Sequence, residues 1–362
     1  MITKPTLLVD EKKCRENIQK MVEKAKRNDV TLRAHVKTHQ SLSVGKWLKE
    51  AGIEKITVSS LEMAKYFSKE WGDITVAFPV NILEIATINL LASCIQLNLL
   101  VENRETIDFL NKHVEHPIGF FIKIDIGYHR TGILPNNFQL IDEILHETSS
   151  NDKLKFLGFI GHAGHSYKST SIAEIERIHN ESIAQILPLK EKYHVEYPEL
   201  IISVGDTPTC SVVEDFSMVD EIRPGNFVFY DLTQAQIGSN HLDQIAVAMA
   251  CPIVAIHPEK NEIIMYGGGV HFAKDAYQDP ELGTIYGKVA EKTASGWGNI
   301  IPGIYVKSLS QEHGIISVSS ELINSFKIGD ILYILPVHAC LTADCHQTYQ
   351  LLDNTVISRF VY

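Results

Sequence analysis

Long apolar segments are missing from this chain of 362 residues. No run reaches the roughly 18–20 apolar residues that a membrane-spanning helix requires. The first residues, MITKPTLLVDEKK, lack the apolar core of a secretory signal peptide. Six cysteines are too scattered for the disulfide framework of a small secreted protein. We therefore expect a soluble protein of the reducing cytoplasm that has no membrane segment.

An excess of basic residues is also missing. The chain has 33 Lys and Arg against 44 Asp and Glu, a net charge of −11 and a pI near 5.8. This balance argues against nucleic acid as a partner, because binding to the phosphate backbone requires positive charge. Hydrophobic residues make up 45% and charged residues 21%, which is ordinary globular usage and excludes bulk disorder. The length predicts two domains, or one large α/β domain with an appendage.

Short apolar runs alternate with amphipathic stretches between residues 31 and 230. Runs such as LIISV and FFIKIDI are typical of parallel strands that are covered on both faces. The expected strands are 32–35, 55–60, 74–80, 96–102, 119–127, 157–164, 200–205 and 218–224, and the expected helices are 44–51, 60–69, 82–93, 104–113, 138–146 and 172–193. This alternation predicts an α/β fold with a (β/α)8 TIM barrel. An open, doubly wound sheet is the alternative, although no G-x-G-x-x-G motif follows the first strand.

The pattern changes after about residue 240. Segments such as AVAMACPIVAIHP, NEIIMYGG, HGIISVS and DILYILPVH look like strands separated by turns, with little helical periodicity. They predict a smaller C-terminal domain that is mainly β. The strand-like TLLVD near the N-terminus is able to pair with either part. We expect the barrel to span residues 11–238, and residues 1–10 and 239–362 to form the mainly β domain.

Polar residues gather where the expected barrel strands end, and the chemistry of a barrel lies at the C-terminal ends of its strands. Lys37, in RAHVKTHQ, follows the first strand. A lysine just past a buried strand is expected to be desolvated, which lowers its pKa and suits it to a Schiff base with a carbonyl cofactor. A solvent-facing loop lysine is the simpler interpretation, and spacing alone favours it.

Three further motifs follow later strands. GHAGHSY provides acid–base or ring-stacking groups, although a core histidine is the simpler interpretation. GDTPT and RPGN place glycine beside small polar residues where barrels commonly bind phosphate through backbone N–H groups, and ordinary turns are the alternative. The candidate residues in these motifs are His162, His165, Tyr167, Gly205, Asp206, Thr207, Arg223, Gly225 and Asn226.

A possible metal pair lies in PVHACLTADCH, in the β domain. If this segment is a strand, His338 and Cys340 point to the same side. Imidazole and thiolate suit zinc, and two protein ligands leave positions for water and substrate. A buried cysteine beside an incidental histidine is equally compatible with the pattern. Cys345 and His346 are weaker candidates because they follow a turn, and a Cys340–Cys345 disulfide is not expected in a reducing compartment.

Together these motifs resemble the metal-dependent D-threonine aldolase / D-serine dehydratase family, whose pyridoxal-phosphate (PLP) enzymes have an alanine-racemase-like barrel of fold type III. The resemblance implies that Lys37 forms the Schiff base with PLP and that Arg130 approaches the cofactor ring. It also implies that GDTPT and RPGN bind the phosphate, and that His338 and Cys340 are the metal pair. The motifs that carry it, in order, are HVKTH, KIDIGYHRTG, GHAGHSY, GDTPT, EIRPGNFVFYD, SQEHG and PVHACLT.

Two positions depart from the family pattern. Asp206 stands where the family has a small hydroxyl residue, and a carboxylate repels phosphate unless only its backbone N–H takes part. GGGVHFAKD (267–275) is a loose match. Within the family, His-x-Cys is typical of zinc dehydratases and His-x-Asp of aldolases. The reason is that thiolate favours zinc, whereas carboxylate favours manganese or magnesium. Zinc is therefore the expected metal, with manganese or another divalent ion as the alternative.

The resemblance implies dehydration of a small D-β-hydroxy amino acid, D-serine or D-threonine, to a 2-oxo acid and ammonia by a homodimer. Lys37 would remove the α-proton, and His162 or His165 would relay protons. Arg223 or Tyr167 would contact the pyridine nitrogen of the cofactor. Retro-aldol cleavage to glycine and an aldehyde, amino-acid racemisation and a non-enzymatic PLP carrier are the alternatives.

Overall fold

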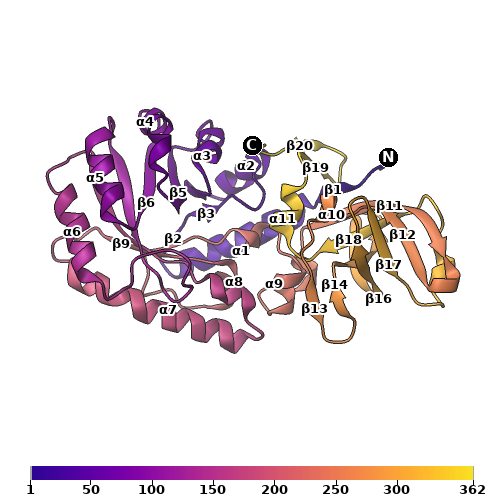
Figure 1. The fold of residues 1–362 in the computed structure, drawn as a ribbon. Coiled ribbons are helices and arrows are strands. Elements are labelled where there is room, and N and C mark those ends of the chain that lie inside the picture. Colours follow the sequence, from indigo (N-terminus) through magenta and orange to yellow (C-terminus); the bar gives the residue numbers. More distant parts are fainter. Residues whose placement is uncertain (1, 362) are drawn as a thin grey trace. The chain divides into compact units, whose positions relative to one another are not determined.

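The computed structural model describes residues 2–361. The chain divides into two compact units, one formed by Gln19–Gly225 and the other by the residues up to Ile18 together with Asn226–Val361. In Figure 1 the first unit runs from indigo to magenta, and the second is mainly orange and yellow. The segment 226–238, which the sequence pattern groups with the barrel, belongs to the second unit, where the Thr233 hydroxyl donates to the Val337 carbonyl over 2.8 Å.

The first unit contains a parallel sheet whose two edges are the same stretch of chain. In the sheet order β2-β10-β9-β8-β7-β6-β5-β4-β3, the edge strands β2 and β3 are separated only by Arg33. One segment therefore pairs with both β10 and β4 and closes the sheet, so the predicted eight-stranded barrel is confirmed and the open-sheet alternative is wrong. The strands are β2 (Thr31–Leu32), β3 (Ala34–His35), β4 (Lys55–Val58), β5 (Asp73–Pro79), β6 (Gln96–Val101), β7 (Ile118–Lys123), β8 (Leu154–Ile160), β9 (Ile201–Val204) and β10 (Glu221–Ile222).

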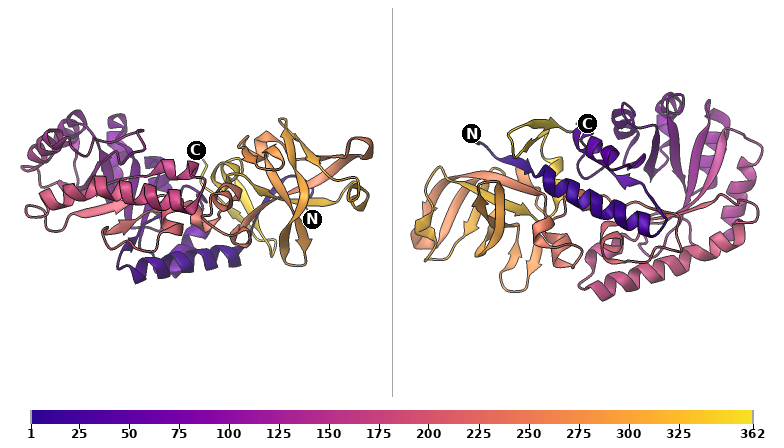
Figure 2. Two further views of the ribbon diagram at one scale, coloured as in Figure 1. Left: turned by 90° about the horizontal axis from the view of Figure 1, so that it is seen from below. Right: turned by 180° about the vertical axis from the view of Figure 1, so that it is seen from behind.

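Helices surround these strands. Several begin at a side-chain cap: Ser60, Asn103 and Ser171 each accept a hydrogen bond from a backbone N–H in the first turn. Figure 2 shows the long helix α7 along the outside of the barrel strands. The helices of this unit are α2 (Leu42–Glu50), α3 (Leu61–Phe67), η1 (Ile82–Glu84), α4 (Ile85–Ala92), α5 (Arg104–His113), α6 (Phe138–Thr148), η2 (Gly164–Lys168), α7 (Ile172–Tyr193) and α8 (Thr207–Val212).

One helix, α1 (Glu11–Arg27), is absent from the sequence-based expectations. It is strongly polar, so its composition alone does not mark it as a core element. Its buried apolar residues are Cys14, Ile18, Met21, Val22 and Ala25. Their spacing is that of one helical face.

The second unit is mainly β, as predicted. Its sheet order is β12-β17-β16-β15-β18-β11-β1-β19-β20, and β12 also pairs with β11, so six strands form a closed antiparallel ring. The N-terminal strand β1 joins this sheet, antiparallel to β11 and parallel to β19. The strands are β1 (Thr6–Val9), β11 (Val247–His257), β12 (Glu262–Tyr266), β13 (Tyr277–Asp279), β14 (Gly283–Ile285), β15 (Gly287–Thr293), β16 (Gly296–Leu309), β17 (His313–Ser317), β18 (Ile331–Pro336), β19 (Thr348–Leu351) and β20 (Val356–Ser358).

Short helices complete the second unit. They are η3 (Asn226–Val228), α9 (Leu232–Gln236), η4 (Leu242–Gln244), η5 (Pro258–Lys260), α10 (Gly269–Phe272), η6 (Ile323–Ser325) and α11 (Ala339–Asp344). All six cysteines are free, so Cys340 and Cys345 are not joined. None of the helices within residues 2–361 is long and apolar enough to cross a bilayer.

Candidate active site

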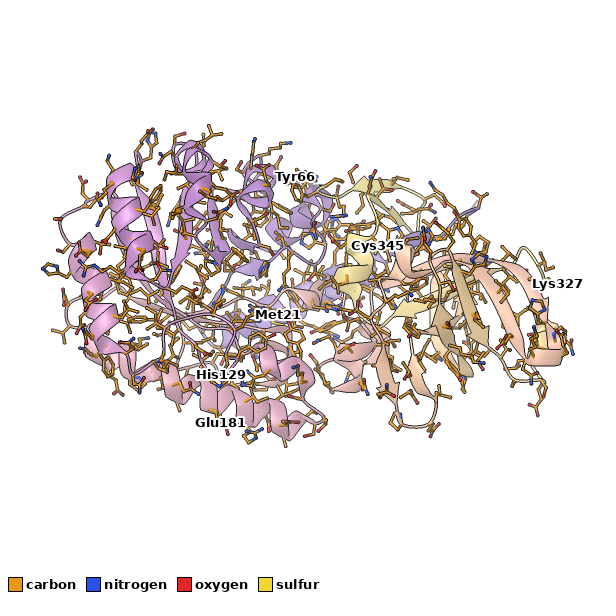
Figure 3. The ribbon with its side chains drawn as sticks, in the orientation of Figure 1. Met21, Tyr66, His129, Glu181, Lys327 and Cys345 are labelled. Carbon is orange, nitrogen blue, oxygen red and sulfur yellow. The ribbon has the colours of Figure 1, made fainter. Side chains whose placement is uncertain are left out.

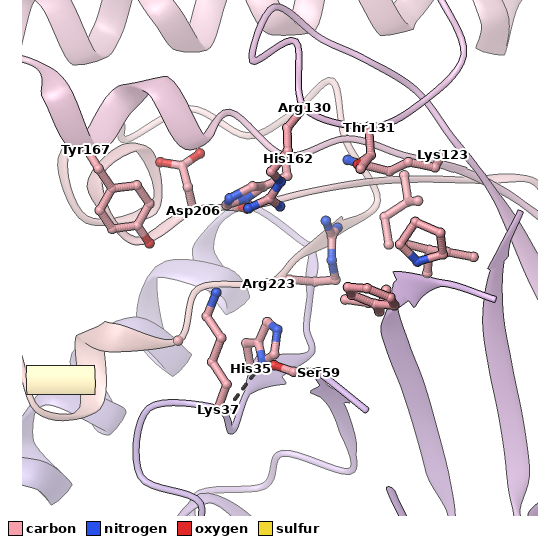
Figure 4. Close-up of a pocket in the computed structure, with 17 residues that line it drawn as sticks. His35, Lys37, Ser59, Lys123, Arg130, Thr131, His162, Tyr167, Asp206 and Arg223 are labelled. Carbon is pink, nitrogen blue, oxygen red and sulfur yellow. Dashed lines mark hydrogen bonds between the residues drawn. The ribbon is translucent and has the colours of Figure 1, made fainter. Parts of the chain in front are cut away.

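A cavity of about 420 Å³ lies in the barrel unit, at the ends of the parallel strands. It collects residues from turns that are far apart in the sequence (Figure 4). The predicted site residues on its wall are Lys37, Arg130, His162, Tyr167, Gly205, Asp206, Arg223 and Gly225. Three other predicted residues, His165, Thr207 and Asn226, are not on the wall. Sequence reasoning missed the remaining polar wall residues, His35, Ser59, Lys123 and Thr131.

Lys37 lies in the turn that follows β3. Its side chain lines the cavity and is exposed, so the expected desolvation is not found. The cause is the turn, which places the side chain in the open cavity and not in the core below the strand. The backbone N–H of Lys37 donates to His35 Nδ1 over 3.4 Å (Figure 4), and this bond helps to fix the turn.

The desolvated lysine of the cavity is Lys123, the last residue of β7. It is only 6% exposed. Burial, followed by the positive charges of Arg223 and Arg130, lowers its pKa to about 7. Its ammonium has no hydrogen bond or ion pair among the described residues, although the charges of Asp125 and Glu102 oppose the lowering of its pKa. The sequence does contain a signal for Lys123: it interrupts the otherwise apolar strand FFIKIDI, and a lysine is rarely buried without a reason.

Arg223 follows β10 and is held by two hydrogen bonds. Its Nη1 donates to Ser203 Oγ over 2.5 Å and its Nη2 to the Gly161 carbonyl over 2.7 Å. Ser203 in turn donates to Glu221 over 2.6 Å. Burial lowers the pKa of Arg223 to about 10, so the guanidinium is still charged at neutral pH. The side chain is therefore a fixed cation on the cavity wall.

Asp206, the departure from the family pattern, caps helix α8. Its carboxylate accepts hydrogen bonds from the Thr209 N–H over 2.9 Å, the Thr209 hydroxyl over 2.8 Å and the Ser166 hydroxyl over 2.7 Å. Figure 4 shows this carboxylate pointing away from the amine of Lys37. Burial raises the pKa of Asp206 to about 6. The side chain thus serves the local fold, a role that a hydroxyl residue also fills at an N-cap.

The two predicted phosphate loops lie side by side. Gly205 has φ +156°, and a Cβ there would lie 2.5 Å from the Arg223 backbone nitrogen. A Cβ on Gly225 would lie 2.8 Å from the His35 carbonyl oxygen. Both glycines are therefore required for the close approach of these backbones. The Gly225 N–H donates to the Thr207 hydroxyl over 3.3 Å, and this bond joins the two loops.

The two histidines of GHAGHSY have different surroundings. His162 lies on the cavity wall and its Nδ1 is 2.7 Å from the Gly205 carbonyl, so Nδ1 carries a proton that it donates. Burial and the charge of Lys123 hold the pKa of His162 well below its usual value, which leaves Nε2 as an acceptor. His165 stacks against Tyr128, with ring centres 6.2 Å apart. Of the two, the fold brings only His162 to the cavity.

Charge gives the cavity its character. Lys37, Lys123, Arg130 and Arg223 line it, and among the described residues Asp206 is the only carboxylate on its wall. The oxygens of Asp206 accept hydrogen bonds from Thr209 and Ser166, so the wall has more basic than acidic side chains. These residues fit PLP, which has an anionic phosphate and an aldehyde that an amine attacks.

The metal candidates do not lie on a strand. Strand β18 ends at Pro336, His338 is the N-cap residue of α11 and Cys340 lies in that helix. The predicted strand geometry is therefore wrong. The physical reason is that ACLTAD forms a helical turn whose first N–H, at Ala339, is bound by the buried Asp231 over 2.9 Å.

His338 and Cys340 nevertheless lie close together. Burial opposes a charge on the His338 ring, but the neighbouring Asp275, Cys340 and Asp231 outweigh burial and raise its pKa to about 11. No group of three or more His, Cys, Asp or Glu side chains suited to a metal occurs within residues 2–361. The arrangement thus fits, at most, a metal with two protein ligands.

Asn226, predicted for the phosphate site, has a different contact. Its side-chain amide donates to Asp231 over 2.6 Å. Asp231 is 0% exposed and also accepts from the Gln234 N–H over 2.9 Å. The Asn226 side chain is thus bound inside the second unit, close to the peptide that links the two metal candidates.

Comparison with known proteins agrees with both units. The family model for the alanine racemase N-terminal domain matches residues 9–232, and the model for a putative serine dehydratase domain matches residues 246–352. The D-serine dehydratase of Dictyostelium discoideum is 30% identical over 386 residues, covering 98% of this chain and 95% of that protein. This chain belongs to the D-serine dehydratase family with an alanine-racemase-like barrel.

Other members of this family are similarly close. The D-threo-3-hydroxyaspartate dehydratase of Delftia sp. is 27% identical, covering 96% of this chain and 93% of that protein. Its solved structure has a TM-score of 0.91 at 25% identity and covers 100% of this chain and 98% of that one. D-threonine aldolase from Filomicrobium marinum has a TM-score of 0.80 at 17% identity, over 99% of this chain and 96% of that one, and shows a shared fold.

Two solved variants of the Delftia dehydratase are informative. In one, a cysteine is replaced by alanine and the protein is in the metal-free form; in the other, a histidine two positions earlier is replaced by alanine. The spacing of these two positions equals that of His338 and Cys340.

Proposed function

We propose that this chain is a PLP- and metal-dependent dehydratase that converts a small D-β-hydroxy amino acid, such as D-serine or D-threonine, into a 2-oxo acid and ammonia. The observation that carries the proposal is the cationic cavity with Lys37 on its wall, in a chain whose family members are lyases of this kind. The His338–Cys340 pair supports the dependence on a metal.

Lys37, Arg223 and the two glycine loops would hold the cofactor. When bound, PLP withdraws the electrons left at the α-carbon after proton removal. The loops at Gly205 and Gly225 would face its phosphate. Tyr167 accepts a hydrogen bond from the Thr207 N–H over 3.1 Å, which ties this side chain to the phosphate loop. Of the two predicted candidates for the pyridine nitrogen, Arg223 is therefore the one we propose.

Proton transfer would be carried out by two side chains of the cavity wall. Lys37 is exposed on the cavity wall, and its amine would take the α-proton of the substrate. The Nε2 atom of His162 is a neutral acceptor because Nδ1 is bound to the Gly205 carbonyl. Of the two histidines predicted as proton relays, His162 and His165, we therefore propose His162.

His338 and Cys340 would hold the metal, and thiolate together with imidazole favours zinc. Two protein ligands would leave positions for water and substrate, and the metal would supply Lewis-acid stabilisation of a departing β-hydroxyl. A retro-aldol reaction is the second candidate, because D-threonine aldolase shares the fold. Cys340 favours dehydration, since the family resemblance associates a carboxylate at this position with the aldolases.

A homodimer is a further part of the proposal. Phe78 lines the cavity and is 61% exposed, and Leu83 in the adjoining η1 is 88% exposed. An apolar part of the cavity wall is thus uncovered, and a second copy of the chain would cover it. Light scattering should give about twice the mass of one chain. A single-chain mass with full activity would contradict this part.

One assay separates the candidate reactions. The enzyme is incubated with PLP, Zn²⁺ and D-serine or D-threonine, and 2-oxo acid, ammonia, glycine and aldehyde are measured. We expect 2-oxo acid and ammonia in equal amounts and no glycine. Glycine with an aldehyde would show an aldolase, and formation of the L-amino acid alone would show a racemase.

A further inference from the structure

Helix α10, which comes just before the loop to β13, is fastened at two points to α11 and to the residue that follows its C-cap. The Thr342 hydroxyl donates to the Phe272 carbonyl over 2.9 Å, and the ring Nε2 of His346 donates to the His271 carbonyl over 2.9 Å. Figure 3 labels Cys345, the residue that ends this helix. Residues 271–273 and the helix that carries Cys340 therefore form one local scaffold within the second unit.

The chain then turns sharply at Ala273. This residue has φ +58°, an unfavourable conformation for a non-glycine residue. Two residues later, Asp275 lies beside the start of α11. Its Oδ1 is 3.7 Å from Nδ1 of His338, and the two side chains are 30% and 37% exposed. The turn thus places a carboxylate beside a candidate metal ligand.

We propose that Asp275 is the positioning residue for His338. Its carboxylate is within ion-pair distance of Nδ1, which would favour a proton on Nδ1, orient the ring and leave Nε2 for the metal. Histidine ligands in metal sites are commonly held in this way by a carboxylate. The inference rests on the proposed metal pair, and it assigns a role to GGGVHFAKD, the motif that matches the family only loosely.

The backbone between the two ligands is fixed separately. Asp231 accepts the Ala339 N–H over 2.9 Å, and it is completely buried. Ala339 is the residue between His338 and Cys340. The peptide is thus held by Asp231, whereas the ring of His338 interacts with Asp275 and Cys340. Loss of Asp275 should therefore loosen the ring without displacing α11.

Zn²⁺ affinity of the holoenzyme tests the proposal, measured by competition with a chromogenic chelator. Asp275→Asn should weaken Zn²⁺ binding about 10- to 100-fold, and Asp275→Glu should restore part of the loss. Glu312→Gln is the matched control, because Glu312 lies 3.8 Å from His271 in a similar pair of the same unit. Its Zn²⁺ affinity should equal that of the wild type. Unchanged affinity in Asp275→Asn would overturn the proposal.

Co²⁺ spectra separate a positioning role from direct ligation. At saturating Co²⁺, Asp275→Asn should keep the thiolate charge-transfer band of Cys340 and the intensity of the d–d bands, because the ligand set is unchanged. A change in d–d intensity would make Asp275 a ligand and overturn the positioning role. If His338→Ala binds Zn²⁺ as the wild type does, the proposed metal pair is wrong. This outcome is distinct from failure of the positioning role of Asp275, in which only the Asp275 variants behave like the wild type. Equal far-UV circular dichroism in all variants shows that folding is retained.

Discussion

The two units differ in the sign of the charges that surround their candidate site residues. In the barrel unit, the cavity wall carries Lys37, Lys123, Arg130 and Arg223. In the second unit, the His338 ring is surrounded by Asp275, Asp231 and Cys340. The first environment is suited to an anion and the second to a cation. Under the proposed function, PLP would be held by residues of the first unit and the metal by residues of the second.

The sources of these groups also differ. The cavity residues come from the ends of several strands, such as Lys123 at the end of β7 and Arg223 after β10. His338 and Cys340 lie within one segment of three consecutive residues. Loss of one cavity side chain should therefore weaken PLP binding only in part, except at the lysine that binds PLP covalently. Loss of His338 or Cys340 would remove one of the two proposed metal ligands and should have a larger effect on metal affinity.

The largest effect is expected for Lys37→Ala. Activity should fall by about 10³-fold or more, because the variant lacks both the cofactor-binding amine and the proposed base. The Schiff-base absorbance and the borohydride-reducible adduct should disappear, while Zn²⁺ binding is unchanged. Mass spectrometry of the reduced protein is the critical measurement. An adduct on Lys123, the other lysine of the cavity wall, would contradict the assignment.

His338→Ala and Cys340→Ala test the other side of the comparison. Dehydration should fall by about 10²-fold or more, because the metal is lost, and the Schiff-base absorbance should remain. Cys345→Ala is the control, since this exposed thiol follows the same helix. Chelator treatment of the wild type should reproduce the loss, and added Zn²⁺ should reverse it. Full activity without metal would contradict the metal-dependent mechanism.

The barrel was predictable because the same sequence pattern, an apolar run followed by an amphipathic stretch, is repeated along the chain. Eight apolar runs with helices between them fit few folds, and Lys37 and Arg223 follow strand ends that must lie at one edge of a barrel. Lys123 was not singled out, because its burial depends on neighbours that are distant in the sequence. The helix at 339–344 was not predicted either, since a six-residue turn has no periodicity. What fixes it is Asp231, more than 100 residues earlier in the chain.

The burial of Lys123 predicts how the stability of the protein depends on pH. Its pKa is about 7 in the folded protein and about 10.4 when unperturbed, so between these values the unfolded chain binds a proton that the folded chain does not. Stability of the cofactor-free protein should thus rise with pH through this window, and the burial cost is fully present below pH 7.

Lys123→Met should remove this dependence. At pH 6 the variant should be more stable than the wild type by on the order of a few kcal/mol, and the difference should shrink towards pH 10. Urea unfolding across this range is the measurement. Lys155→Met, at an exposed position of the same barrel, should show no such trend. A Lys123→Met variant that is less stable at pH 6 would show that the ammonium has a compensating partner.

The smallest effect is expected for Asp206→Ser. Serine is able to cap α8 at the Thr209 N–H, so at about pH 4 stability should change by about 1 kcal/mol or less. PLP affinity should stay within a factor of about two, because the carboxylate points away from Lys37. The pKa of Asp206, about 6 in the folded protein, exceeds its usual value of about 3.9. The folded wild type therefore loses stability as pH rises from about 4 to 6, and Asp206→Ser should lack this fall. A large loss of PLP affinity in Asp206→Ser, measured by cofactor titration, would place the carboxylate in the phosphate site.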